Sequence, residues 1–88
     1  MMPWKVTLTL EAEKQLNKLD KVNRERVVEL FKRLESMETP TDLGRKMVGD
    51  CAGTMRFRTG KIRVICTIIH EILIIEALVI DKRSDAYD

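Results

Sequence analysis

The chain has 88 residues, of which 44% are hydrophobic and 34% are charged, and its formal net charge is +2. This length predicts one domain, spanning residues 1–88, with a modest core. No apolar run approaches the roughly 20 residues of a membrane span, and the amino-terminal segment lacks the charged region and cleavage site of a signal peptide. We therefore expect a cytoplasmic protein without a membrane segment.

The cysteine and histidine content argues against a metal site. The sequence has two cysteines and one histidine and no CxxC pair, so it lacks the ligand spacing of dedicated metal centres. In an intracellular protein both thiols are expected to be reduced, with Cys66 in a buried strand and Cys51 in a loop. We expect no metal and no cofactor.

The amino-terminal half predicts a strand followed by a helical hairpin. Apolar and polar residues alternate from Trp4 to Leu10, as in a half-buried strand. Thr9 is suited to cap a first helix, and a turn near Asp20 to Asn23 leads to a longer helix that ends at about Met37. The apolar residues of the two helices recur at spacings of three and four, which indicates core packing. They are Ala12, Leu16, Leu19, Val27, Leu30, Phe31, Leu34 and Met37.

The carboxy-terminal half predicts three strands, preceded by an irregular segment from Pro40 to Gly53. Thr59-Gly60 suits a two-residue hairpin loop, and in that register Arg56 would face Arg63 and Arg58 would face Lys61. A second turn near His70-Glu71 would lead to a last strand over residues 72–80. The expected fold is α+β, in the order β-α-α-β-β-β, with the helical hairpin packed on one face of a mainly antiparallel sheet.

Positive charge is concentrated in one segment of the chain. Between Arg45 and Arg63 there are six basic residues against the single Asp50. Strand alternation places the basic residues of the hairpin on the face away from the helices. Their mutual repulsion would be relieved by bound phosphates, although arginine on a surface strand also serves solubility and protects a sheet edge.

Two segments resemble the carboxy-terminal half of the RelE/ParE toxin superfamily. They are RFRTGKIRVI, which fits the R-x-R-x-G-x-x-R-V-I hairpin common in that superfamily, and ILIIEALVIDKRSDAY, which ends in its basic-R-S-x-x-Y segment. The strand and helical hairpin of the amino-terminal half fit as well, so the resemblance covers nearly the whole chain. No single motif is decisive, but order, spacing and length agree.

The resemblance implies a toxin of a type II toxin–antitoxin pair. RelE-like members cut messenger RNA in the ribosomal A site, using the ribose 2′-hydroxyl as nucleophile, whereas ParE-like members poison DNA gyrase. Both bind a cognate antitoxin that covers the basic surface. The function that we expect here is that of a RelE-type endoribonuclease. The alternatives are a ParE-type gyrase poison and a catalytically silent relative that acts with its antitoxin in operator repression.

The resemblance also implies roles for particular residues in RNA cleavage. Arg63 would stabilise the phosphorane with its forked donors, and Arg56 would hold the scissile or neighbouring phosphate. Arg83, with Lys82 beside it, would contact phosphate or assist the leaving group, and Tyr87 would stack on a base or share a proton. The residues expected to guide backbone phosphates are Arg45, Lys46, Arg58, Lys61 and Lys82.

The proton acceptor is the part of the mechanism that the sequence leaves unassigned. Thr54 stands where the best-known RelE pattern has a lysine, and arginine is a poor base because it is always protonated. His70 is expected in a surface turn at the sheet end away from Arg63, and Glu76 is expected to be a structural charge in mid-strand.

Overall fold

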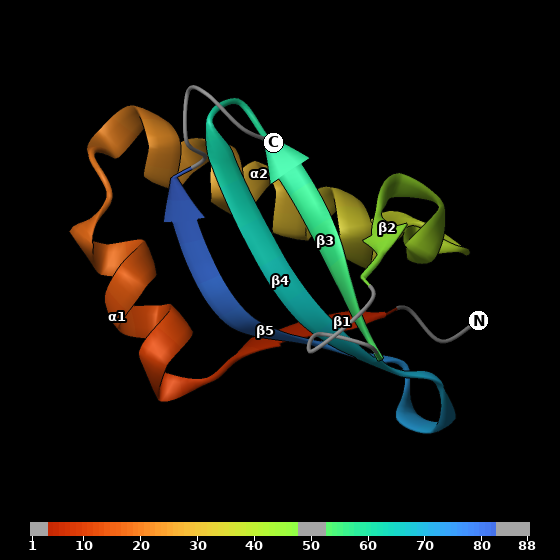
Figure 1. Cartoon of the computed structure of the whole chain (residues 1–88). Coiled ribbons are helices and arrows are strands. Elements are labelled where there is room, and N and C mark those ends of the chain that lie inside the picture. Colours follow the sequence, from red (N-terminus) through yellow and green to blue (C-terminus); the bar gives the residue numbers. More distant parts are fainter. Residues whose placement is uncertain (1–3, 48–52, 83–88) are drawn as a thin grey trace.

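The computed structural model describes residues 4–47 and 53–82. In this part of the chain two helices lie against one face of a five-stranded sheet whose strand order is β1-β5-β4-β3-β2 (Figure 1). The strands are β1 (Lys5–Leu8), β2 (Arg45–Lys46), β3 (Thr54–Thr59), β4 (Ile62–Ile69) and β5 (Ile74–Lys82). The helices are α1 (Leu10–Lys18) and α2 (Lys21–Ser36), with short 3₁₀ turns at Pro40–Leu43 and His70–Ile72.

The sheet is mixed, because β1 runs parallel to β5 while the other neighbouring strands are antiparallel. The predicted α+β fold with a helical hairpin on one face is therefore confirmed. None of the helices in residues 4–47 and 53–82 is long and apolar enough to cross a membrane.

Side-chain caps determine where the two helices begin. The Thr9 hydroxyl accepts a hydrogen bond from the backbone N–H of Ala12 at 3.1 Å, as predicted. Asp20 caps α2 in the same way, and hydrogen bonds from the side chain and backbone of Asn23 lower the pKa of this carboxyl. The expected turn near Asp20 to Asn23 is present but lies earlier, at Leu19 and Asp20, because α2 already begins at Lys21. Leu10 starts α1 and is 68% exposed, so it does not extend the first strand.

The core lies between the helices and the inner face of the sheet. The predicted stripe of α2 is buried at four positions, and Met37 beyond the end of the helix is half-buried. The buried apolar residues of α2 and the central strands are Val27, Leu30, Phe31, Leu34, Met55, Phe57, Ile62, Val64, Cys66, Ile75, Ala77 and Ile80.

A short strand, β2, replaces part of the irregular segment expected before Gly53. Arg45 lies opposite Arg56 and Lys46 opposite Met55 in antiparallel pairing with β3. The chain can reach β3 because Gly44 has no side chain: a Cβ atom there would lie 2.8 Å from the ring of Phe57. Two residues are too few to show strand alternation, which explains why the sequence pattern does not predict β2.

The connection from β4 to β5 ends in an unusual backbone conformation. The predicted turn near His70 is present as the 3₁₀ turn, and Leu73 then adopts a left-handed conformation with φ of 54°. The last strand therefore begins at Ile74 and extends to Lys82, two residues later at each end than expected. A bulge beside Ile65 and Cys66 interrupts the β4–β5 pairing.

Candidate functional site

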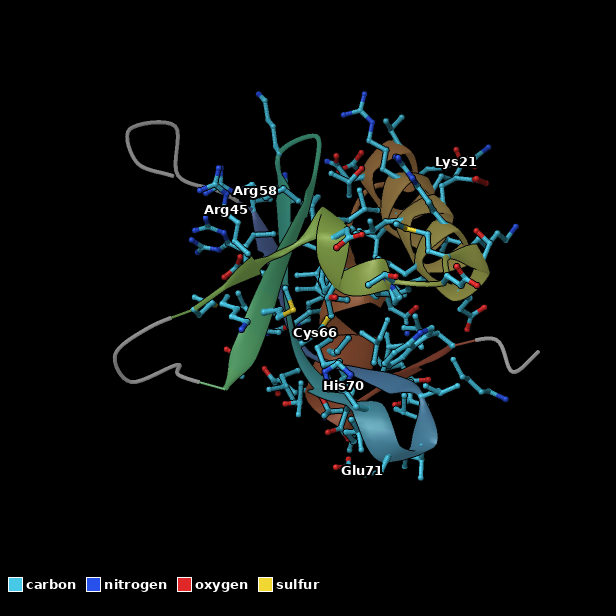
Figure 2. The ribbon with its side chains drawn as sticks, turned by 90° about the vertical axis from the view of Figure 1, so that its right-hand side faces the viewer. Lys21, Arg45, Arg58, Cys66, His70 and Glu71 are labelled. Atoms are coloured by element: carbon cyan, nitrogen blue, oxygen red, sulfur yellow. The ribbon has the colours of Figure 1, made fainter. Side chains whose placement is uncertain are left out.

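Arginine side chains converge on the face of the sheet that the helices leave uncovered. Arg45 of β2, Arg56 and Arg58 of β3, and Arg63 of β4 have the alternation that directs them away from the core. Figure 2 shows the side chains of Arg45 and Arg58 on the opposite side of the sheet from the helices. We call these four residues the arginine cluster.

The arginine cluster is arranged in two cross-strand rows. Arg58 lies directly opposite Arg63, and Arg45 lies directly opposite Arg56. Directly paired residues have Cβ atoms about 5 Å apart, and diagonal neighbours such as Arg56 and Arg63 lie about 7–8 Å apart. A single phosphate group can therefore be reached from both rows.

The hairpin register differs from the predicted one. The loop consists of Gly60 and Lys61, so that Thr59 faces Ile62 and Arg58 faces Arg63. The expected pairs of Arg56 with Arg63 and of Arg58 with Lys61 are wrong, and Lys61 lies in the turn. Because the register is displaced by two residues, each side chain still points to its predicted face.

A small hollow lies between the arginine side chains of β2 and β3. It measures about 110 Å³, and its walls among the described residues are Leu43, Arg45, Arg56 and Arg58. Guanidinium groups are planar donors that match the geometry of phosphate oxygens. The hollow thus has the chemistry of an anion site.

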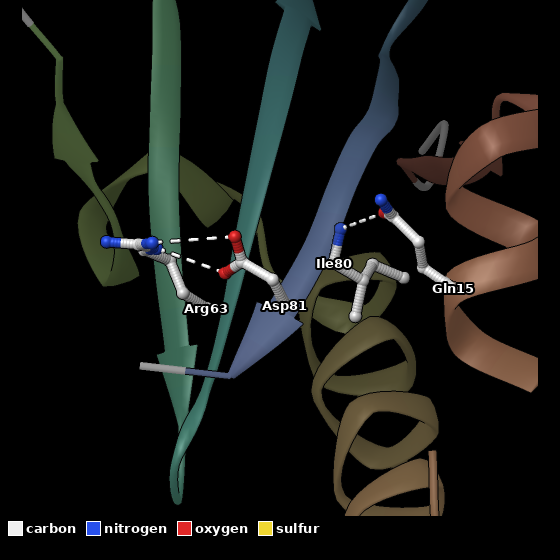
Figure 3. Close-up of polar contacts among 4 residues, drawn as sticks. All are labelled: Gln15, Arg63, Ile80 and Asp81. Carbon is white, nitrogen blue, oxygen red and sulfur yellow. Dashed lines mark hydrogen bonds and ion pairs between the residues drawn. The ribbon is translucent and has the colours of Figure 1, made fainter. Parts of the chain in front are cut away.

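Arg63 also forms an ion pair with Asp81 on the neighbouring strand β5, an acidic residue that the sequence analysis did not single out. Its Nε donates to Oδ1 of Asp81 at 3.2 Å and its Nη2 donates to Oδ2 at 3.4 Å (Figure 3). Arg63 and Asp81 are paired directly in the β4–β5 ladder. The two side chains are 30% and 44% exposed, so solvent and ligands can reach the pair.

The remaining basic residues predicted to bind RNA that the structure describes lie outside the arginine cluster. Lys46 lines a second hollow together with Thr54 and His70 at the far end of β3, while Lys82 is exposed at the end of β5. Lys46 pairs with buried Met55, so it alternates to the face opposite Arg45. Arg83 and Tyr87 lie outside the described residues.

The side chains considered as proton acceptors lie apart from Arg63. His70 is seven residues along β4 from Arg63, about 23 Å in an extended strand, and its ring meets Trp4 edge-on at 5.7 Å between centroids. Glu76 is on the outer face opposite Thr67, four residues or about 13 Å from Arg63 along β4. His70 is an exposed turn residue, as predicted.

The thiol of Cys66 lies in the core and not among the arginine side chains of the candidate site. Cys66 is in the core on the inner face of β4, and burial raises the pKa of its thiol to about 12. It is a free cysteine that remains protonated near neutral pH. Within residues 4–47 and 53–82 no three His, Cys, Asp or Glu side chains form a group that could hold a metal ion.

Comparison with known proteins identifies the family. The profile of the family described as the ParE toxin of the type II toxin–antitoxin system parDE matches residues 6–87. A search of curated proteins gives no match.

Solved structures of related toxins share the fold. A chain of the toxin–antitoxin complex RelBE2 from Mycobacterium tuberculosis is 31% identical, with a TM-score of 0.85 and 97% of each chain covered. The archaeal RelE–RelB complex from Pyrococcus horikoshii gives 25% identity and a TM-score of 0.74 over 96% of this chain and 99% of that one. The isolated Escherichia coli RelE toxin, at 20% identity and a TM-score of 0.68 over 92% and 85% of the two chains, shares the fold. The chain therefore belongs to the ParE toxin family within the RelE/ParE superfamily, and it is the toxin of a type II toxin–antitoxin system.

Proposed function

We propose that this toxin is an endoribonuclease that cleaves messenger RNA on the ribosome, in the A site, without a metal ion. The observation that carries the proposal is the arginine cluster on the exposed sheet face, where Arg45, Arg56 and Arg58 line a hollow of about 110 Å³. Four cations on one face attract a polyanion and position its backbone. A messenger RNA target also implies that the protein acts in the cytoplasm.

Cleavage would proceed by attack of a ribose 2′-hydroxyl on the adjacent phosphate. The phosphorane carries additional negative charge, which forked guanidinium donors stabilise better than a single ammonium group. Arg63 would supply these donors, and Arg56, its diagonal neighbour, would hold the same or the next phosphate. Arg83 and Tyr87 are proposed for the leaving group and for stacking on a base.

The second part of the proposal is a cognate antitoxin as partner. The related toxins from M. tuberculosis and P. horikoshii were solved in complexes with antitoxins. An acidic antitoxin segment lying across Arg56, Arg58 and Arg63 would neutralise the arginine cluster and exclude RNA from it. One surface would then serve both inhibition and substrate binding.

A ParE-type gyrase poison is the alternative that specific observations favour. The matching family profile is that of ParE toxins, and Thr54 replaces the lysine of the best-known RelE pattern. A gyrase poison requires binding and no proton transfer. A catalytically silent relative that acts through its antitoxin in operator repression would also tolerate Thr54.

Mapping of message ends after induced expression separates these functions. The endoribonuclease predicts growth arrest with new 5′ ends inside translated codons, and loss of these ends in the Arg63→Ala variant. Intact messages together with gyrase-dependent DNA breaks would establish the ParE function instead. Absence of both effects, in a folded protein that binds its antitoxin, would favour the silent relative.

A further inference from the structure

Asp81 is the acidic side chain in direct contact with the arginine cluster in the described part of the chain. It continues the row formed by Arg58 and Arg63, so that the three residues lie side by side across β3, β4 and β5. Its carboxylate accepts two hydrogen bonds from Arg63 and is 44% exposed (Figure 3). A carboxylate beside an arginine proposed to bind phosphate opposes binding of a polyanion, so docking alone does not favour an acidic residue at this position.

The chemistry of RNA cleavage gives that explanation. The phosphorus that the 2′-oxygen attacks is bonded to the 3′-oxygen of the same ribose, and in a reactive geometry the 2′-oxygen and the phosphorus lie about 3–3.5 Å apart. A base that serves this hydroxyl must therefore be adjacent to the residue that holds the phosphate. Asp81 has this position relative to Arg63, whereas Glu76 lies about 13 Å along the strand and His70 lies at the opposite end of β4.

We propose that Asp81 is the proton acceptor for the 2′-hydroxyl, an inference that rests on the proposed endoribonuclease function. A phosphate is a forked acceptor like a carboxylate, so the scissile phosphate can replace Asp81 in the fork of Arg63. The exchange leaves a carboxylate oxygen beside the ribose while Arg63 holds the reacting phosphate.

The reaction step then balances in atoms and charge. Asp81 takes the proton of the 2′-hydroxyl as the 2′-oxygen forms its bond to phosphorus, and the bond between phosphorus and the 5′-oxygen breaks. The 5′-oxygen leaves as a hydroxyl by taking up a proton from a general acid or from water. The products are a 2′,3′-cyclic phosphate and a 5′-hydroxyl end, and no oxidant or metal is consumed.

Single-turnover cleavage on programmed ribosomes at saturating toxin tests this role. Asp81→Asn is nearly isosteric and keeps a side-chain acceptor for Arg63, but it cannot take up the proton. General acid–base catalysis contributes a factor of about 10²–10⁴, so we expect a rate loss of that order. Asp81→Glu, which retains a carboxylate, should recover part of the rate.

Two controls separate proton transfer from structure and from charge. Glu76→Gln removes another outer-face carboxylate of β5 and should leave the rate unchanged. Ribosomes whose A-site codon carries a 2′-deoxynucleotide cannot be cut, and they report binding alone. Asp81→Asn should bind them as tightly as the parent or up to about fivefold more tightly, since a competing charge is removed.

The outcomes distinguish this inference from the proposed function. A parent that cuts messages, with an Asp81→Asn variant that is folded and equally fast, overturns the role of Asp81 alone. Parallel losses of rate and of binding in Asp81→Asn also overturn it, because they indicate a structural role. A parent that cuts no message refutes the proposed function itself and this inference with it.

Discussion

The carboxylate of Glu35, near the end of α2, accepts a hydrogen bond from the backbone N–H of Val6 on the edge strand β1, at 2.8 Å. An edge strand exposes backbone donors that can pair with other chains. Glu35 satisfies one such donor with a charged acceptor, and it joins α2 to a strand that is distant in sequence.

Removal of this acceptor should destabilise the fold. We expect Glu35→Ala to lower the free energy of unfolding by about 1–3 kcal/mol, and Glu35→Gln to lower it less because an acceptor remains. Urea denaturation measures both. Glu38→Ala is the control, because the bond from Trp4 Nε1 uses the backbone carbonyl of Glu38 and not its side chain. An Ala variant at 35 as stable as the parent would show that the bond contributes nothing.

The hairpin turn gives a second prediction, at Gly60. Its φ is +58°, and an added methyl group would overlap the guanidinium of Arg26 from α2. The left-handed conformation alone costs an alanine about 1–2 kcal/mol, so Gly60→Ala should destabilise by at least that amount. In an Arg26→Ala background the loss should be smaller, since the overlap is gone. The measurement is a double-mutant cycle by thermal unfolding. If Gly60→Ala destabilises both backgrounds equally, the positive φ alone explains the need for glycine.

The same glycine explains how the register could have been predicted from sequence. A Thr59-Gly60 loop needs a positive φ at Thr59 to form a type I′ turn, and a β-branched residue resists this. A Gly60-Lys61 loop places glycine first, as type II′ requires, and Gly60 has the positive φ while Lys61 does not. Hydrophobic alternation could not decide, because both registers direct Phe57 and Ile62 to the core.

The position of Asp81 on the outer face beside Arg63 could not be predicted from the sequence pattern. From Ile69–Ile74 to Cys66–Ala77 the β4–β5 ladder keeps one register, but beyond the bulge Ile65 pairs with Val79, which leaves Leu78 as the additional residue. Without the bulge Ile80 would face Arg63 and Asp81 would alternate to the inner face. The run from Ile72 to Ile80 is almost entirely apolar, so alternation carries no information about a bulge within it.

Other parts of the fold and site did follow from the sequence. The Thr9 cap, the buried stripe of α2 and the outward face of Arg56, Arg58 and Arg63 each depend on local rules that tertiary contacts reinforce here. The contact of Arg63 with Asp81 depends on two distant strands and a bulge. Short-range sequence patterns do not determine such a contact.

The buried thiol predicts a pH dependence of stability. An unfolded cysteine titrates near pH 8.5, whereas burial raises the pKa of Cys66 to about 12. A group whose pKa is raised in the folded state stabilises fully below its unfolded pKa, and this contribution is lost as pH rises toward the folded value. Stability should therefore fall between about pH 9 and 12. In Cys66→Ala the fall should be shallower, although the variant is less stable at pH 7; urea midpoints across the pH range provide the measurement.

The arginine cluster predicts salt-dependent binding of the antitoxin. Charge reversal by Arg58→Glu should weaken binding, because an acidic segment would then meet a like charge at the centre of the surface. Lys32→Glu changes the charge of an exposed residue on α2 equally and should have little effect. Binding measured by calorimetry should weaken as the salt concentration rises from about 50 to about 500 mM, because the Debye screening length then shortens from roughly 14 to roughly 4 Å. An affinity that is indifferent to salt and to Arg58→Glu would exclude the cluster from the interface.

The last prediction separates chemistry from docking within the arginine cluster. Arg63→Ala removes donors directed at the phosphorane, so the single-turnover rate at saturating toxin should fall by about 10² or more. Arg63→Lys keeps the charge without the fork and should restore only part of the rate. Arg58→Ala should instead raise the toxin concentration needed for half-maximal rate, because a backbone-phosphate contact positions the substrate without entering the reaction. Tyr87→Phe retains the ring for stacking and tests whether its hydroxyl proton is used. An Arg63→Ala variant that is folded and cuts as fast as the parent would reduce the cluster to a docking surface.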